Sequence, residues 1–506
     1  MEISPDASAF TARYNAGEAQ LVWTTLVGDL ETPVSAFLKI AGGKPNTFLF
    51  ESVEGGAVRG RYSIIGLDPD VIWRTRGARA EINRNALNDP NAFEPCSEPP
   101  LAALRALVAE SKLEVPDALP PMAAGVFGYL GYDMVRLMEK LPKPNPDPLG
   151  DADAILIRPT LIVVFDAVKD AITVITPVRP EKDVTAKAAH ARAIGRLEAV
   201  VDALEKPLPS EEGAIDFDPL KIATTSNTTP AEYEKMVLDA KEYILAGDVF
   251  QVVLSQRFEA PFPLPPFSLY RALRRTNPAP YLYFLNFADL SVAGSSPEIL
   301  VTARDGKVTV RPIAGTRPRG ATPHEDKALE DELLADPKER AEHLMLLDLG
   351  RNDVGRVSEI GTVKVTDRFF IERYSHVMHI VSNVEGNLDT KKHDALSALI
   401  AGFPAGTVSG APKIRAMEII DELEKEKRGI YSGCVGYFSA GGDMDTCIVL
   451  RTALIKDGKM YVQAGAGIVA DSNPKSEQQE CVNKAKALFH AAEEARRFAS
   501  AAKRGQ

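Results

Sequence analysis

Cysteine is scarce in this chain of 506 residues, and its spacing excludes two kinds of cysteine chemistry. The chain has four cysteines, Cys96, Cys434, Cys447 and Cys481, and no two of them form a CxxC pair. Neither a disulfide framework nor a zinc knuckle is therefore indicated. A chain of this length can bury large cores without disulfides. We expect a reduced protein of the cytoplasm.

Basic charge and long apolar runs are also lacking. Lys and Arg number 59 against 70 Asp and Glu, which gives a net charge of −11 and no basic surface for nucleic acid. No apolar run approaches the ~18 residues of a membrane helix. The first residues, MEISPDASAF, lack the charged region and apolar core of a secretory signal. We therefore expect neither nucleic acid nor a membrane as a partner.

The remaining sequence divides into two unequal parts. Residues 207–228 are rich in Pro, Ser, Thr and acidic residues, and they are predicted to be a linker between residues 1–206 and residues 229–490. Residues 491–506 are predicted to be a solvated helical tail that frays. The second part mixes strand patterns with long helices, predicted at 231–245, 337–349, 411–427 and 474–499. Because strands and helices do not alternate regularly, an α+β fold is favoured over a doubly wound parallel sheet.

Two of these helices carry glutamates three residues apart. Glu342 shares an apolar stripe of its helix, where a carboxylate is costly unless it is paired or bound to a metal. Glu339 precedes it by one turn and also fits a helix-capping residue. Glu477 and Glu480 repeat the spacing near the start of the last long helix, with Lys484 on the same face. The set suits Mg²⁺, although such pairs are also common on solvated helices.

Three glycine-bearing segments are candidates for binding an anion. Residues 406–413 (GTVSGAPK) precede a helix, so that backbone N–H groups and the Thr407 hydroxyl could meet a negative group. Gly465-Ala466-Gly467 interrupts a strand, and Gly315-Thr316 ends a hairpin that turns at Asp305-Gly306. Each segment also has a purely structural interpretation, as a loop or a β-bulge.

An arginine and a histidine stand among apolar residues. Arg451 lies within a single strand predicted over 445–456, where its guanidinium either reaches solvent or grips a carboxylate with two hydrogen bonds. Tyr431 is a candidate for the same pocket. His379 lies in a strand predicted over 376–384, and it is either a structural core histidine or an acid/base group.

Five ordered motifs resemble the chorismate-utilising enzymes, and specifically the component I (aminase) subunits of anthranilate synthase. They are RPIAGTRPRG (311–320), ERAEHLMLLDLGRNDVGRV (339–357), GTVSGAPKIRAMEII (406–420), DTCIVLRTAL (445–454) and QAGAGIVADSNPKSEQQE (463–480). The resemblance implies a layered α/β/β/α sandwich with antiparallel sheets and outer helices. It also implies that chorismate and ammonia are converted to anthranilate and pyruvate, with Mg²⁺ on the ring carboxylate, in tryptophan biosynthesis.

The same resemblance implies roles for individual residues. Glu342 and Glu480 would hold Mg²⁺, supported through water by Glu339 and Glu477. The implied catalytic residues are His379, Thr407 and Lys484. The residues implied to hold the carboxylates of chorismate are Gly315, Thr316, Tyr431, Arg451, Gly465, Ala466 and Gly467.

Two positions distinguish the chain from related chorismate enzymes. Ala314 stands where para-aminobenzoate synthases carry a lysine nucleophile. Gln251 stands where isochorismate and salicylate synthases carry a lysine base for water. The absence of both lysines favours ammonia as the nucleophile. An aminodeoxychorismate synthase, an aminodeoxyisochorismate synthase and a non-catalytic tryptophan-binding regulator remain alternatives.

The resemblance further implies feedback inhibition by L-tryptophan and a second subunit. The implied tryptophan-binding residues are Glu51, Ser52, Pro280, Tyr281 and Leu282, although residues 277–281 also fit a simple turn before a strand. The chain has no GxCxG motif with the nucleophilic cysteine of a glutamine amidotransferase. The resemblance implies that a separate glutamine amidotransferase subunit (component II) supplies the ammonia.

Overall fold

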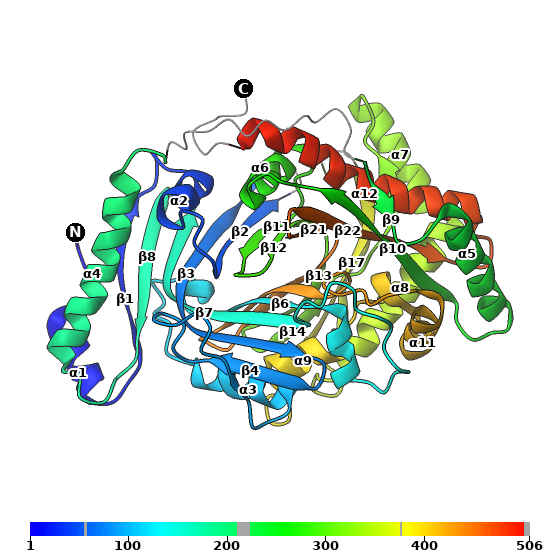
Figure 1. Ribbon diagram of the computed structural model, residues 1–506. Helices are drawn as coiled ribbons and strands as arrows, with labels where there is room; N and C mark the ends of the chain where they lie inside the picture. Colours follow the sequence, from blue (N-terminus) through cyan, green and yellow to red (C-terminus); the bar gives the residue numbers. More distant parts are fainter. Residues whose placement is uncertain (55–57, 210–222, 375–376, 500–506) are drawn as a thin grey trace.

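Two antiparallel sheets packed face to face, with helices on both outer surfaces, form the centre of the molecule (Figure 1). The computed structural model describes residues 1–54, 58–209, 223–374 and 377–499. Every strand pairing in it is antiparallel, and the strands are hydrogen-bonded into one continuous network. The predicted α+β class is confirmed.

The first sheet runs from the amino-terminal strand to the strand that follows the predicted linker. Its order is β1 (Gln20–Val27), β8 (Ala171–Val178), β7 (Ala154–Asp166), β3 (Val58–Arg76), β2 (Thr47–Glu54), β11 (Tyr281–Asn286), β12 (Ser291–Ser296), β21 (Thr452–Lys456), β22 (Lys459–Ile468) and β10 (Gln251–Pro261). The short strands β9 (Thr225–Ser226) and β18 (Gly410–Ala411) pair with β10.

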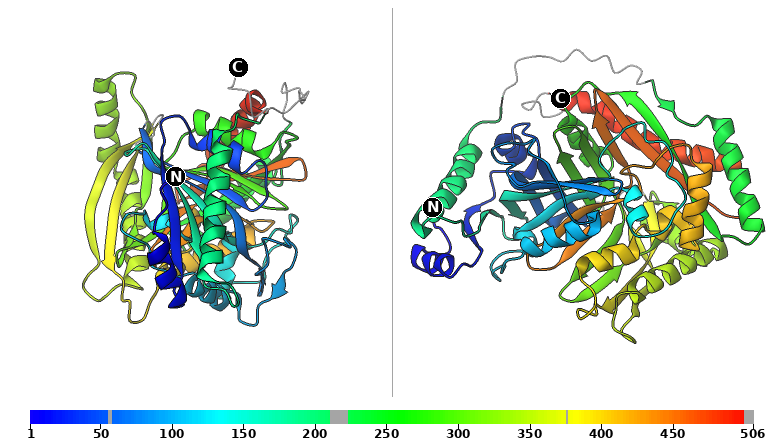
Figure 2. Two further views of the ribbon diagram at one scale, coloured as in Figure 1. Left: turned by 90° about the vertical axis from the view of Figure 1, so that its left-hand side faces the viewer. Right: turned by 60° about the horizontal axis from the view of Figure 1, so that its bottom comes forward.

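The second sheet shares two strands with the first. Its order is β5 (Glu94–Pro95), β4 (Arg79–Asn83), β3, β7, β6 (Gly125–Leu130), β19 (Cys434–Ser439), β20 (Met444–Ile448), β13 (Ile299–Arg304), β14 (Lys307–Val310) and β17 (Val377–Asn387). Two further strands, β15 (Ile313–Pro318) and β16 (Lys364–Arg373), flank β17, and β16 and β17 form a curved ribbon at the edge of the molecule (Figure 2).

The long strands β3 and β7 join the two sheets. β7 pairs with β8 through residues 162–166 and with β6 through residues 154–157. Between these segments, the β3–β7 register shifts at Pro69 and Val71. A register shift of this kind bends a strand pair, which lets each strand enter both sheets.

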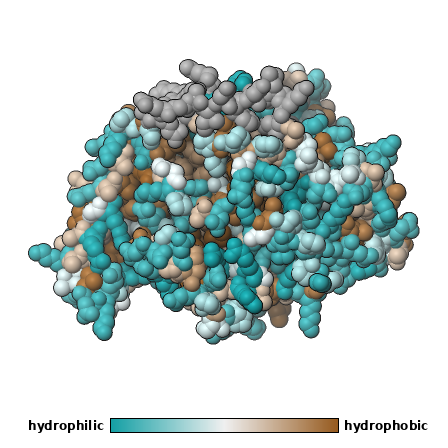
Figure 3. Space-filling view, in the orientation of Figure 1, coloured by the Kyte–Doolittle hydropathy of each residue, from teal (hydrophilic) through white to brown (hydrophobic). Residues whose placement is uncertain are grey.

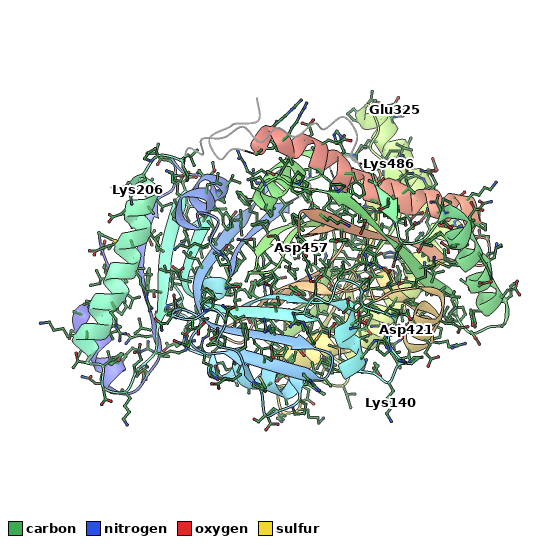
Figure 4. The ribbon with its side chains drawn as sticks, viewed as in Figure 1. Lys140, Lys206, Glu325, Asp421, Asp457 and Lys486 are labelled. Atoms are coloured by element: carbon green, nitrogen blue, oxygen red, sulfur yellow. The ribbon has the colours of Figure 1, made fainter. Side chains whose placement is uncertain are left out.

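Strands from both predicted parts of the chain alternate in the sheets. β2 pairs with β11, and β6 pairs with β19, so residues 1–206 and 229–490 contribute to each sheet. An ion pair from Arg136 in the first part to Asp421 in the second (labelled in Figure 4) adds to these contacts. Most of the predicted linker, residues 210–222, lies outside the described residues. The predicted boundary therefore does not separate the sheets.

Helices cover the outer faces, and their polar sides make the visible surface mainly hydrophilic (Figure 3). One apolar core lies between the sheets and contains Phe48, Phe127 and Tyr283. The helices over the first sheet are α1 (Ala7–Asn15), α2 (Pro33–Ile40), α4 (Ala186–Glu205), α6 (Pro266–Thr276) and α12 (Pro474–Ala495), with α5 (Pro230–Leu245) and α11 (Lys413–Leu423) beside β10. Those over the second are α3 (Pro100–Glu110), α7 (Pro323–Ala335), α8 (Pro337–Gly355), α9 (Ala395–Gly402) and the short α10 (Gly406–Ser409).

The carboxyl-terminal helix corrects the prediction of a solvated tail from residue 491. Helix α12 continues to Ala495, and a 3₁₀ turn follows over Arg496–Phe498. Ala491, Ala492 and Ala495 are buried in the core formed with α6, and the Arg271 guanidinium lies over the Phe498 ring at 4.8 Å. The apolar stripe thus extends past the predicted boundary, because small alanines let α12 approach α6 closely. Residues 500–506 lie outside the described residues.

The described residues contain no helix with the length and apolar character needed to cross a membrane.

A buried histidine on α8 gives the fold a predictable pH dependence. The His343 side chain is fully buried, its Nε2 lies 2.7 Å from the Ser382 hydroxyl, and no group in the described residues forms a hydrogen bond with its Nδ1. Burial lowers the pKa of His343 to about 4. Below pH ~6.5 the unfolded chain binds this proton and the folded chain does not, so stability falls as the pH falls.

Acidification from pH 7 to pH 4 is therefore expected to cost about 3 kcal/mol of unfolding free energy through His343 alone. Urea unfolding of the wild type and of His343→Gln at a series of pH values measures this contribution. The wild type should lose stability faster than the variant between pH 6.5 and 4. Parallel curves would contradict the assignment.

Candidate active site

A cavity of about 910 Å³ brings together five residues that the sequence predicts for the site. It lies between α12, the strands β15 and β17, and the residues that precede β11 and β21. The predicted residues that line it are Thr316, His379, Arg451, Glu480 and Lys484. They come from positions up to 168 residues apart in sequence, so only the folded sheets bring them together.

His379 is held by the strand beside it. Its Nδ1 lies 2.9 Å from the carbonyl oxygen of Gly315 and 3.1 Å from the Thr316 hydroxyl. A carbonyl can only accept a hydrogen bond, so Nδ1 carries the proton and Nε2 is left as the basic nitrogen. Burial lowers the pKa of His379, the bond to Gly315 opposes this, and the positive charge of Arg451 adds to it. The imidazole is therefore neutral near pH 7 and can accept a proton.

Gly315 owes its place beside His379 to its backbone conformation. Its φ is +70°, in the left-handed region that favours glycine, and the β15–β17 register shifts between Ala314 and Thr316. A Cβ at Gly315 would meet the Glu339 carboxylate at 3.0 Å. The bulge thus turns the Gly315 carbonyl toward His379 and leaves no space for a larger residue.

Arg451 corrects the prediction of a single strand over 445–456. The strand is broken into β20 and β21, and Arg451, at φ +48°, occupies the break. Within the part of the chain that the structure describes, no hydrogen bond or ion pair reaches its guanidinium, and burial lowers the pKa of this group. A half-buried cation without a counter-ion on the wall of a cavity is a binding site for an anion.

Lys484 brings a second positive charge to the same cavity. Its ammonium group donates to the Gly465 carbonyl at 2.8 Å and pairs with Glu480 at 2.7 Å. Tyr431 is behind this wall, because a Cβ at Gly465 would meet its hydroxyl at 2.9 Å. Tyr431 is buried and lines a separate cavity of about 40 Å³, with the Arg428 guanidinium 5.6 Å from its ring centroid. Lys484, which is bonded to Gly465, therefore lines the large cavity, whereas Tyr431 does not line it.

Four glutamates of α8 and α12 influence one another electrostatically. Burial raises the pKa of Glu342, a hydrogen bond from Gln251 opposes this, and Glu339 and Glu480 raise it further. Burial likewise raises the pKa of Glu477, with a further contribution from Glu480. Carboxylates whose negative charges raise one another's pKa in this way favour a nearby cation.

These carboxylates suit a Mg²⁺ site in which the protein provides only one or two ligands. No group of three or more His, Cys, Asp or Glu side chains converges on a point in the described ranges, so a site with three protein ligands is not formed. Mg²⁺ commonly binds one or two carboxylates together with water and an anionic substrate. Glu342 on α8 and Glu480 on α12, which influence each other electrostatically, match that chemistry, and Glu339 forms an ion pair with Arg317 at 3.1 Å.

Gln251 links the glycine segment of β22 to Glu342. Its Nε2 donates to Glu342 at 2.9 Å, and no donor among the described residues reaches its Oε1 although the residue is 3% exposed. A Cβ at Gly467 would come within 2.7 Å of Gln251 Nε2, so a larger residue at this position would displace the amide. Ala466, between the two glycines, is fully buried against α5 and α11. Gly465 and Gly467 thus shape the site, and Ala466 packs behind it.

Thr407 lies with a residue that the sequence did not single out. Glu298 and Thr407 line a small cavity of about 20 Å³ beneath β13, and the Thr407 hydroxyl lies beside the carboxyl without a well-aligned hydrogen bond. Burial raises the pKa of Glu298 to about 8, against the opposing effects of Thr407 and the Ile313 N–H. Glu298 is therefore a neutral acid near pH 7. The SSPEIL segment contains no periodicity or spacing that marks it.

A second cavity, of about 710 Å³ between the sheets, contains the residues predicted for tryptophan. It is lined by aromatic and charged side chains, including Tyr281, Tyr437, Arg304 and Arg311, and also by Ser52 and Pro280. Tyr281 and Ser52 are direct partners in the β2–β11 ladder. The pairing of these strands therefore brings together two motifs that lie more than 200 residues apart in sequence.

Glu51 and Leu282 also border this cavity, but their side chains are directed elsewhere. The Glu51 carboxylate binds Arg274 at 2.7 and 2.9 Å and also accepts from Tyr270, and both partners lie on α6. Leu282, opposite Glu51 in the ladder, packs into the outer core with the same helix. Alternation along a strand sends neighbouring side chains to opposite faces, so Ser52 and Tyr281 face the cavity while Glu51 and Leu282 face α6.

Comparison with known proteins places this geometry among enzymes that use chorismate. Residues 63–490 match the chorismate binding enzyme family. The chain is 57% identical over 499 residues to anthranilate synthase component 1 of Cereibacter sphaeroides, covering 98% of this chain and 99% of that protein. It is 50% identical over 470 residues to the component 1 of Pseudomonas aeruginosa, covering 92% and 94%.

Solved structures show the same architecture. Anthranilate synthase component I from Streptococcus pneumoniae superimposes with a TM-score of 0.75 at 38% identity, covering 92% of this chain and 98% of that one. The menaquinone-specific isochorismate synthase of Escherichia coli, at 18% identity, has a TM-score of 0.69 over 96% and 100% of the two chains, and this similarity concerns the fold alone.

Proposed function

The chain belongs to the chorismate-binding enzymes, as an enzyme of the anthranilate synthase type, and we propose that it is the Mg²⁺-dependent aminase component. In this proposal it converts chorismate and ammonia to anthranilate and pyruvate in tryptophan biosynthesis. It works in the cytoplasm with a glutamine amidotransferase subunit, since the relatives are named as component 1 of a larger enzyme. L-Tryptophan inhibits it.

One observation carries the proposal. Three groups that line the 910 Å³ cavity are the Arg451 guanidinium, which has no ion-pair partner among the described residues, the Lys484 ammonium group and the neutral imidazole of His379. Chorismate carries two carboxylates, which match two positive groups, and its conversion to an aromatic ring requires removal of a ring proton. Arg451 forms two hydrogen bonds with one carboxylate of chorismate, and Lys484 attracts the other carboxylate.

The residues of the chain divide the proton transfers between a base and an acid. His379, with Nε2 unprotonated, accepts the ring proton when the ring becomes aromatic. Glu298 follows Pro297 of the cavity wall and has a pKa of about 8, so in this proposal it is assigned the proton that the departing 4-hydroxyl needs. Thr316 and Gly315 fix the imidazole in its tautomer. Glu342 and Glu480 would hold Mg²⁺, which would supply a Lewis acid for the reaction at the ring.

Gln251 favours ammonia over water as the nucleophile. Its amide cannot act as the base that water would need, while its free Oε1 can accept a hydrogen bond from ammonia. None of the four cysteines has the environment of a glutaminase nucleophile, because Cys434, Cys447 and Cys481 are buried and burial raises the pKa of all four thiols, including that of the partly buried Cys96. The ammonia therefore comes from the partner subunit.

The 710 Å³ cavity suits tryptophan because it combines aromatic rings with charges of both signs. In a bound tryptophan, the carboxylate would meet Arg304 and Arg311, the ammonium group would meet Glu372, and the indole would stack on the tyrosine rings. Ser52 and Pro280 line the same space.

A direct assay tests this function. Purified chain with chorismate, Mg²⁺ and an ammonium salt should form anthranilate, followed by its fluorescence, together with an equal amount of pyruvate. Glutamine should replace ammonium only when the amidotransferase subunit is present. An aminated product without pyruvate would favour an aminodeoxyisochorismate or aminodeoxychorismate synthase, and tryptophan binding without any product would favour the non-catalytic regulator.

Removal of the metal is expected to abolish turnover, and Mg²⁺ should restore it. Glu480→Gln removes one ligand charge, so the Mg²⁺ concentration for half-maximal activity should rise by at least 10-fold, in line with the loss of a carboxylate ligand. Glu493→Gln on the exposed, distant end of α12 serves as the control and should leave the Mg²⁺ titration unchanged. An unchanged titration in Glu480→Gln would contradict the ligand assignment.

A further inference from the structure

The 910 Å³ cavity proposed to bind chorismate (the catalytic cavity) and the 710 Å³ cavity proposed to bind tryptophan (the regulatory cavity) share part of one wall. Pro297 and Tyr374 line both the 910 Å³ and the 710 Å³ cavities. The segment 277–281 also spans the wall, since Asn277, Pro278 and Ala279 line the first cavity while Pro280 and Tyr281 line the second. Of these groups, Tyr374 bears the only hydrogen-bonding side chain that the described residues place in both cavities.

On the regulatory side, Tyr374 is tied to an ion pair. Its hydroxyl donates to Glu372 Oε2 at 2.9 Å, and Arg311 donates to Glu372 Oε1 at 3.1 Å. Arg311 and Glu372 both line the 710 Å³ cavity, and their side chains are each 30% exposed. This pair is therefore within reach of a ligand in that cavity, and it is accessible enough to exchange partners.

On the catalytic side, Tyr374 packs against the proposed base. Its ring lies edge-on to the His379 imidazole, with the ring centroids 5.4 Å apart and the planes at 64°. Tyr374 is 6% exposed, and its carbonyl accepts a hydrogen bond from Arg319 at 2.8 Å. Because Glu372 and His379 are also partners in the β16–β17 ladder, the three groups form one continuous contact.

We propose that Tyr374 is a positioning residue that transmits occupancy of the 710 Å³ cavity to His379 through its hydrogen bond to Glu372. The inference rests on the proposed function, in which that cavity takes tryptophan and His379 is the base. A tryptophan zwitterion has a carboxylate that competes for Arg311 and an ammonium group that competes for Glu372. When Glu372 turns to the ammonium group, Tyr374 loses its partner and the ring no longer holds the imidazole in place.

Coupling between two sites requires that the contacts differ between the free and the bound state, and the contacts of Glu372 differ in this way. In the free state Glu372 bonds Tyr374, and in the bound state it bonds the ligand. By reciprocity, a carboxylated ring analogue that orders His379 and Tyr374 in the catalytic cavity weakens tryptophan binding by the same factor.

The experiment compares the binding of tryptophan with its inhibitory effect. Wild type, Tyr374→Phe and Tyr437→Phe are titrated with tryptophan by calorimetry, and the ammonium-dependent formation of anthranilate is measured over the same concentrations. Tyr374→Phe keeps the ring and removes the bond to Glu372. Its Kd for tryptophan should stay within about threefold of the wild type, while saturating tryptophan no longer lowers its remaining activity.

Tyr437→Phe is the matched control, because Tyr437 lines the regulatory cavity and not the catalytic one. In this variant Kd and the inhibition constant should move together. The pH profile of kcat adds a readout that a purely structural role would not move: tryptophan should shift the limb due to His379 in the wild type and leave it in place in Tyr374→Phe.

Equal inhibition of Tyr374→Phe and the wild type, at equal Kd, would overturn the coupling role and leave the proposed function intact. A wild type that forms anthranilate but binds no tryptophan would overturn both the regulatory part of the proposed function and this inference. A wild type that forms no anthranilate would overturn the proposed function itself.

Discussion

Arg451→Met is expected to lower kcat/KM for chorismate by about 100-fold or more, mainly through a higher KM. The described residues provide no counter-ion for this half-buried guanidinium, so a bound carboxylate is the group that neutralises it, and removing one partner of such a charge pair costs several kcal/mol. Methionine keeps much of the volume and loses the charge. Initial rates at a series of chorismate concentrations, with ammonium saturating, measure the effect.

The folded state should not suffer from this change. An unpaired buried cation is itself costly, so Arg451→Met is expected to unfold at the same or a higher temperature. Arg351→Met serves as the control, because Arg351 is exposed on α8 and pairs with Asp348 on the same helix. A variant with normal KM would show that Arg451 does not bind the substrate.

His379→Gln is expected to reduce kcat by about 10²–10⁴-fold, the usual contribution of a general base. Glutamine can still donate a hydrogen bond to the Gly315 carbonyl, so the backbone should keep its shape, but its amide does not accept a proton. KM for chorismate should change little, since His379 is assigned to proton transfer and not to binding. Steady-state kinetics in the presence of ammonium and Mg²⁺ separate the two constants.

The pH profile identifies the group. Burial and Arg451 lower the pKa of His379, so the acid limb of the wild-type profile should lie below the usual histidine pKa, and the limb should vanish in the variant. His343→Gln is the matched control: this histidine is buried on α8 and does not line the cavity, so the change should affect stability and leave kcat per folded molecule unaltered. A persistent acid limb in His379→Gln would assign it to another group.

Local motifs carried most of the predicted elements. Helices α5, α8 and α12 begin at Pro230, Pro337 and Pro474, at or within one residue of the predicted starts, because the capping side chains of Thr229, Asp336 and Asn473 and a proline at the first position act locally. The hairpin of β13 and β14 turns at Asp305-Gly306 for the same kind of reason. The helices α6, α7 and α9 were not predicted, although α7 has a capping box at Thr322 and Glu325 (Figure 4).

The errors arose where distant contacts decide the outcome. The segment 445–456 reads as one apolar strand, and only its pairing with β13 on one side and β12 on the other explains why it breaks at Arg451. Glu298 shows no pattern in sequence, and its altered acidity comes entirely from burial under β13. The direction of Glu51 depends on Arg274 and Tyr270 of a helix that the sequence did not reveal.

The sequence by itself determined the family, the class of fold and the identity of most candidate site residues, since these depend on motifs and local periodicity. The tertiary structure decided which of them share a cavity, how the two cavities share the wall at Tyr374, and which charges stand without partners. The physical reason is that pairing across the sheets joins residues hundreds of positions apart, and that burial, which sets the protonation of His379 and Glu298, exists only once those sheets have closed.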